Sequence, residues 1–137
     1  MSYKNNFKKC LDGLFESLCD VSDWMYENPE LGFQEFKTSK YLVDYIQSNS
    51  KSVNYPSHGL ETAFDITFGE EGPLTVICVE YDALPEIGHA CGHNIIATAS
   101  IGAGLGLKDI ASKLGIRVKL LGTPAEEGGG GKIILIN

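Results

Sequence analysis

The chain has 137 residues, a length typical of a single domain. Eighteen Asp and Glu residues outnumber eleven Lys and Arg residues, which gives a formal net charge of -7. An acidic chain whose only arginine is Arg117 is a poor partner for nucleic acid. The apolar fraction of 43% is typical of a folded chain, and no apolar run approaches the about 20 residues of a membrane span. Four scattered cysteines favour a cytoplasmic protein with reduced thiols.

Two helices are predicted in the first third of the chain. Apolar residues recur every three or four positions over residues 4–27, and Pro29 then interrupts the pattern. A second helix is expected over residues 35–47. Its buried side would carry Phe36, Leu42, Tyr45 and Ile46.

The remaining elements alternate between strands and helices. Residues 62–68 and 74–80 are predicted strands joined by a hairpin-type loop, and the second is apolar enough to be a central strand covered on both faces. Residues 93–114 favour a helix whose glycines allow close packing against a sheet, and residues 116–121 predict another buried strand. This order predicts an α/β fold with a mainly parallel central sheet flanked by helices.

Cys91 and His93 stand two residues apart around a glycine, so both side chains can face one side of an extended backbone. Thiolate and imidazole groups are good zinc ligands, but a mononuclear site needs three or four ligands. A buried free cysteine beside a loop histidine explains the pair equally well. A third interpretation is a Cys91 nucleophile with His89 or His93 as its base, although no residue that would orient the base is evident.

Glu126 and Glu127 follow the last predicted strand, where α/β folds place their ligands. One carboxylate could bind a metal ion while the other moves protons, as metal-assisted hydrolysis requires. The alternative is a capping box between Thr123 and Glu126, with Pro124 at the first helical position. Glycines at 128–131 would cost such a helix about 3–4 kcal/mol, which favours the catalytic interpretation.

Asp82 also follows a predicted strand, and a turn aspartate that bonds its own backbone is the alternative there. Two phosphate-binding patterns are excluded. Gly131 and Lys132 are not followed by Ser or Thr, and the glycines at 102 and 104 lack both a preceding strand and the third glycine of a dinucleotide fingerprint.

Four motifs in this order resemble those of one enzyme family: Asn28-Pro29-Glu30-Leu31-Gly32, Asp82-Ala83-Leu84-Pro85, His89-Ala90-Cys91-Gly92-His93 and Pro124-Ala125-Glu126-Glu127-Gly128. The family comprises the dinuclear metal-dependent amidohydrolases and metallopeptidases of the aminoacylases and carboxypeptidase G, the M20 type. The Glu80-Tyr81-Asp82 start and the glycine run before Lys132 resemble its branch of aminobenzoyl-glutamate hydrolase and β-alanyl-lysine dipeptidase.

The resemblance implies a role for each residue of the motifs. Cys91 would bridge two divalent metal ions, with His93 on one ion and Glu127 on the other. Glu126 would be the general base that takes a proton from the bridging water and delivers it to the leaving amine. Asp82 would orient the ligands, and zinc is favoured over manganese or cobalt. Asn94 stands where many relatives carry Asp.

The resemblance also implies what surrounds this segment. Residues 1–137 would be the amino-terminal part of a zinc-peptidase-like catalytic domain, without the lid or dimerisation domain and the carboxyl-terminal part. The whole protein, expected to form a homodimer, would hydrolyse an amide bond in a dipeptide or N-acyl amino acid, with neither membrane nor nucleic acid as partner. With too few ligands for two ions, this chain by itself is expected to be inactive. The alternative is a short non-catalytic binding or regulatory module.

Overall fold

Two helices open the chain, as the apolar spacing predicts. The computed structural model describes residues 2–136, and in it α1 spans Tyr3–Glu27 and α2 spans Phe36–Asn49. Leu42 and Ile46 are fully buried, as predicted. The prediction that Phe36 is buried is wrong, because it is the first residue of α2 and its side chain is 49% exposed, while the buried stretch of the helix begins at Thr38.

The sheet has three strands: β1 (Phe64–Phe68), β2 (Leu74–Val79) and β3 (Arg117–Gly122). Their order is β1-β3-β2, with β1 antiparallel and β2 parallel to β3. The α/β class is confirmed, and the sheet itself is mixed. The predicted hairpin between β1 and β2 is wrong, because β3 lies between them. β3 is therefore the central strand, and its residues Val118 and Leu120 are almost wholly buried.

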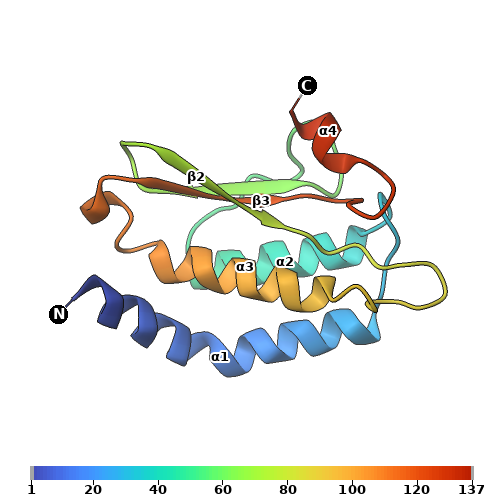
Figure 1. The fold of residues 1–137 in the computed structure, drawn as a ribbon, viewed down its shortest axis with the longest axis horizontal. Coiled ribbons are helices and arrows are strands. Elements are labelled where there is room, and N and C mark those ends of the chain that lie inside the picture. The colour runs from blue at the N-terminus through green and yellow to red at the C-terminus, as the bar shows by residue number, and fades with distance from the viewer. Residues whose placement is uncertain (1, 137) are drawn as a thin grey trace.

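The prediction that β2 is a central strand covered on both faces is wrong for the described part of the chain, because β2 lies at an edge of the sheet and its first three residues are exposed. Figure 1 shows α2 and α3 beneath the sheet with α1 on their outer side, while α4 lies on the opposite side of the sheet. Successive side chains of a strand point to opposite faces. Leu74 and Val76 share one face of β2 and are 42% and 45% exposed, so that face is uncovered over the first part of the strand.

The helix after β2 is shorter than the sequence predicts. α3 spans His93–Leu107, and a 3-10 turn, η1 (Ser112–Leu114), follows it. α3 packs against α1 on one side and against β2 and β3 on the other, so it is buried between them. None of the helices in residues 2–136 is both long and apolar enough to span a membrane.

The segment after β3 is a loop and not a helix. Ala125 has φ +54°, a left-handed conformation that cannot belong to the first turn of a right-handed helix, so the capping-box alternative is not realised. The last helix, α4 (Gly131–Leu135), begins only at the fourth of the glycines at 128–131. The backbone around Glu126 and Glu127 is thus irregular, which leaves both side chains outside any helix.

Candidate metal centre

The parallel pairing of β2 with β3 brings together the two segments that carry the acidic residues, because both segments follow the carboxyl ends of these strands. Val79 ends β2 and Gly122 ends β3, and the two residues are paired across the strands. The N–H of Thr123 donates to the carbonyl of Val79 over 2.8 Å, which continues the register one residue further. Glu80 and Asp82 therefore lie beside Glu126 and Glu127, although more than 40 residues separate the two pairs in the sequence.

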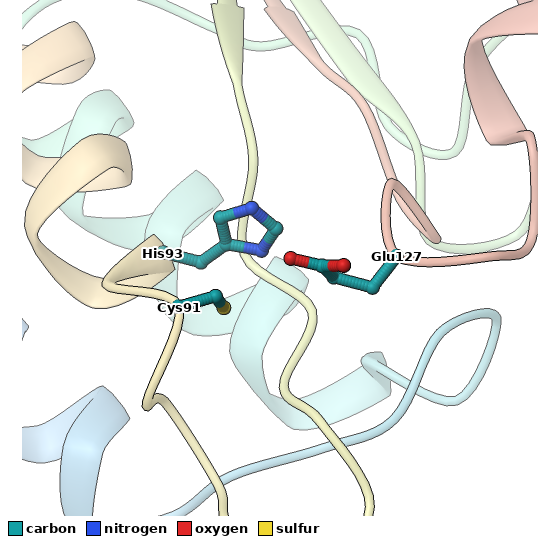
Figure 2. Close-up of side chains that lie close together, drawn as sticks. All are labelled: Cys91, His93 and Glu127. Carbon is teal, nitrogen blue, oxygen red and sulfur yellow. The ribbon is translucent and has the colours of Figure 1, made fainter.

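The start of α3 brings in the third segment. Gly92 caps the helix with φ +85°, and its carbonyl accepts from both Ile95 and Ile96. This turn places Cys91 and His93 on either side of the cap. One ligand atom each of Cys91, His93 and Glu127 lies within 4.8 Å of the others. Figure 2 shows the three side chains converging from the turn before α3, from the first turn of α3 and from the loop after β3.

The backbone of Asp82 orients the ring of His93, which is 3% exposed. His93 Nδ1 lies 2.7 Å from the carbonyl oxygen of Asp82. A carbonyl can only accept a hydrogen bond, so Nδ1 carries the proton and Nε2 presents its lone pair. Metal-binding histidines in general donate their other ring N–H in this way.

The side chain of Asp82 holds the loop that carries the two glutamates. It is fully buried, and its Oδ2 accepts from the N–H of Glu127 over 2.9 Å. Its Oδ1 lies 3.2 Å from His93 Nδ1 but accepts no hydrogen bond from the described residues, because that ring proton is directed at the Asp82 carbonyl. Asp82 is thus not a turn aspartate that bonds its own backbone. It connects a ligand pair from two different elements.

A second acidic cluster shares His93. Ligand atoms of Glu80, His93 and Glu126 also lie within 4.8 Å of one another, with His93 Nε2 at 3.5 Å from Glu80 and 3.7 Å from Glu126. Lys132 is ion-paired with Glu80 and lies 3.6 Å from Glu126. Partial burial lowers the pKa of Lys132, but the hydrogen bond and charge of Glu80, with the charge of Glu126, outweigh it and raise the pKa. A lysine ammonium therefore already compensates the two carboxylates.

The environment of Cys91 argues against an activated thiol. Burial raises its pKa, and the negative charge of Glu127 raises it further, against opposing hydrogen bonds from backbone N–H groups. Without a cation the thiol therefore stays protonated near neutral pH. Burial, with the nearby His93, lowers the pKa of His89, whose two ring nitrogens find no partner among the described residues. The raised pKa of Cys91 favours metal ligation over the nucleophile alternative, because a bound cation would stabilise the thiolate.

The residues present fit one divalent ion. A thiolate, an imidazole and a carboxylate from three elements form a three-ligand set, the number of protein ligands that catalytic zinc sites use before water or substrate takes a further position. The structure brings together all five residues selected from the sequence, and the role of each stays a prediction. Sequence reasoning assigned no role to Glu80 or Lys132, and only the adjacency of Glu80 to Asp82 pointed to the former.

The chain is similar in sequence to proteins that are named as hydrolases. The chain is 37% identical over 140 residues to Xaa-Arg dipeptidase of Mus musculus, an alignment that covers 92% of this chain and 32% of that protein. It is 30% identical to a p-aminobenzoyl-glutamate hydrolase component of Escherichia coli (strain K12), with coverages of 85% and 28%. The chain thus spans about a third of the length of the curated relatives it matches.

A solved structure shows the same fold. The YXEP protein of Bacillus subtilis, described as a dinuclear metal binding peptidase from the M20 family, superposes with a TM-score of 0.78 at 25% sequence identity. The superposition covers 91% of this chain and 39% of that one. No family model matches the chain.

Proposed function

Because the chain belongs to the M20 family of dinuclear metallopeptidases and amidohydrolases, we propose that it supplies part of the active site of a metal-dependent amide hydrolase. The observation that carries the proposal is the convergence of Cys91, His93 and Glu127. The relatives are named for cleaving a dipeptide and an N-acylated glutamate, so a dipeptide or N-acyl amino acid is the proposed substrate class.

In this proposal the described residues divide the work. Cys91, His93 and Glu127 hold a metal ion, for which the donor set favours zinc. When bound, the two ions of such a centre polarise the amide carbonyl and acidify water. Glu126, whose side chain is 37% exposed beside the ligands, takes the proton from the attacking water and gives it to the leaving amine. Asp82 fixes His93 through its carbonyl and Glu127 through its carboxylate.

The described residues supply only one three-ligand set that is free of a lysine. A dinuclear centre therefore needs further ligands, and we expect this chain alone, with added Zn²⁺ or Mn²⁺, to hydrolyse dipeptides far below ordinary enzyme rates. Residues 1–137 would be the amino-terminal part of the catalytic domain, and a homodimeric, cytoplasmic whole protein completes the proposal.

Metal binding by the chain itself tests the site. Cd²⁺ is titrated while thiolate-to-metal charge-transfer absorbance is recorded, and wild type is expected to show a saturable band at one equivalent. The band should vanish in Cys91→Ser and weaken in Glu127→Gln. The matched control is Cys19→Ser, because Cys19 is an exposed thiol on α1. A band that survives Cys91→Ser unchanged would contradict the proposal.

The proposed role of Glu126 as the general base is tested in the whole protein. Glu126→Gln should reduce kcat for a dipeptide by about 10²- to 10⁴-fold, the usual contribution of general acid–base catalysis, and should leave the metal content unchanged. Loss of metal together with activity would instead identify Glu126 as a ligand.

A further inference from the structure

Ala125, directly before the two glutamates, has an unusual conformation for a residue with a side chain. Its φ is +54° and it is fully buried. Its N–H donates to Glu35 Oε1 over 2.8 Å, and its carbonyl accepts from the N–H of Gly131 over 3.2 Å. A non-glycine residue in this region persists only where its surroundings impose it. The contacts of Ala125 therefore determine the path of the loop.

Glu35 reaches this loop from the N-terminus of α2. The residue is 0% exposed, and its carboxylate accepts from the Ala125 N–H and, over 3.1 Å, from the hydroxyl of Thr62. Burial raises the pKa of Glu35, against the opposing effect of hydrogen bonds from its own backbone, from Ala125, from Thr62 and from the backbone of Phe33. Although Glu35 occupies the N-cap position of α2, its side chain makes no capping hydrogen bond to that helix. The carboxyl group therefore does not cap the helix on which it stands.

The segment just before Glu35 also packs under the loop. A Cβ on Gly32 would lie 2.9 Å from the Cβ of Ala125, closer than side-chain carbons approach. Leu31 forms a bridge with Ala83, and the carbonyl of Glu30 accepts from the N–H of Ala83 over 2.8 Å. Residues 30–35 thus contact both segments that carry the acidic residues of the metal centre. This gives the Asn28–Gly32 motif, which the ligand set does not use, a structural role at the site.

Two buried carboxylates therefore hold alternate peptide N–H groups of the same loop. Glu35 binds the N–H of Ala125, and Asp82 binds the N–H of Glu127. Glu126 lies between these two anchored positions. We propose that Glu35 is a positioning residue for the metal centre, which fixes the Ala125 peptide so that Glu126 and Glu127 face Cys91 and His93. The inference rests on the proposed function.

The reach of the side chain, rather than its charge, is what the proposal requires. Glu35→Gln keeps the length, because its carbonyl can accept from Ala125 while its amide donates to Thr62. Glu35→Asp keeps the charge but shortens the side chain by one methylene, about 1.5 Å. Glu35→Met keeps the volume without an acceptor. Ser39→Ala is the matched control, since it removes a buried hydroxyl that bonds Tyr55 one turn along α2 and does not contact the loop.

Cd²⁺ affinity is measured for each variant after circular dichroism has shown that it is folded. Glu35→Asp and Glu35→Met should bind about 10- to 100-fold more weakly than wild type, the usual cost of losing a group that orients a ligand. Glu35→Gln and Ser39→Ala should stay within about threefold. Folded Glu35→Asp with wild-type affinity would overturn the proposal, as would equal losses in Glu35→Gln and Glu35→Asp.

Amide hydrogen exchange at Ala125 provides a readout that needs no metal. The Ala125 N–H should be protected in wild type and in Glu35→Gln, and should exchange at least about tenfold faster in Glu35→Asp. Unchanged protection in Glu35→Asp would overturn the inference even if Glu35→Met fails to fold. If wild type binds no Cd²⁺ through Cys91, the proposed function fails, whereas the exchange experiment still judges Glu35.

Discussion

Two glycine-rich regions of this chain use the same residue for different purposes. In α3 the glycines have ordinary helical backbone, and Gly104 lets the helix approach the sheet, since a Cβ there would lie 2.5 Å from Leu120. After β3, the glycines at 128–130 lie in the loop and Gly131 is the first residue of α4. A Cβ on Gly131 would lie 1.8 Å from the carbonyl oxygen of Pro124. The first region builds the core, and the second shapes the candidate metal centre. Substitutions in the two regions should therefore affect different measurements.

The largest effect on metal binding in this comparison is expected from Gly131→Ala. Its methyl group would meet a backbone carbonyl that cannot move unless the loop opens, and that opening would displace Glu126 and Glu127. We expect Cd²⁺ affinity to fall by about 10- to 100-fold, as when groups around a ligand are lost. Isothermal titration calorimetry measures it. Unchanged affinity would show that the loop tolerates a different path, and it would contradict the claim that the glycines after β3 shape the metal centre.

Gly104→Ala should have the opposite profile. The methyl group would collide with the side chain of Leu120, which is fully buried in β3, so overpacking would cost about 1–3 kcal/mol, partly offset by the better helix propensity of alanine. Urea unfolding should show a lower free energy of unfolding. Cd²⁺ affinity measured where the variant is folded should match wild type, and a parallel loss of affinity would mean that the core and the site are coupled.

Gly13→Ala is a control for both regions, because Gly13 is a glycine whose replacement meets no steric obstacle. A Cβ at this position on α1 would meet no atom within 4 Å, and the backbone is helical. Alanine should therefore stabilise the fold by up to about 1 kcal/mol through helix propensity alone. A higher midpoint in urea is the expected observation. A lower midpoint would show that α1 packs more tightly around Gly13 than the structure indicates.

The smallest effect concerns pH. Burial raises the pKa of Glu35, so the folded state retains this proton to a higher pH than the unfolded chain does. A group that is bound to its proton more strongly in the folded state makes stability fall as pH rises from its unfolded pKa through its folded pKa. Urea unfolding from about pH 4 to about pH 7 should therefore show the stability of wild type falling relative to that of Glu35→Gln. Parallel curves for the two proteins would contradict it.

Much of the fold follows from local patterns. The period of apolar residues places α1 and α2, and short apolar runs place the three strands, within a few residues of their observed bounds. The partners of the strands could not be predicted in this way. The apolar run of β2 is typical of a central strand, but β3 is the strand that hydrogen-bonds on both sides. An apolar strand pattern reports a preference for burial and does not say which strand becomes its neighbour.

The candidate site divides in the same way. Cys91, His93, Glu126 and Glu127 carry metal and proton chemistry in their side chains, so short motifs reveal them. Glu35 carries no such signal, because it stands at a helix start 90 residues before the N–H that it binds. Lys132 is likewise assigned to Glu80 and Glu126 only by their proximity.

The sequence alone therefore determined the kinds of residue at the centre and the elements that carry them, because side-chain chemistry and apolar periodicity are local properties. It also located the glycines of the helix after β2 and the glycine run at residues 128–131. Tertiary structure decided which segments meet: parallel pairing of β2 with β3 brought Asp82 to Glu127, and the turn before α3 brought Cys91 and His93 to Glu127. It also decided that α3 needs glycine for close packing while the loop needs it for its path. Distances between remote residues depend on the whole fold, and no local pattern encodes them.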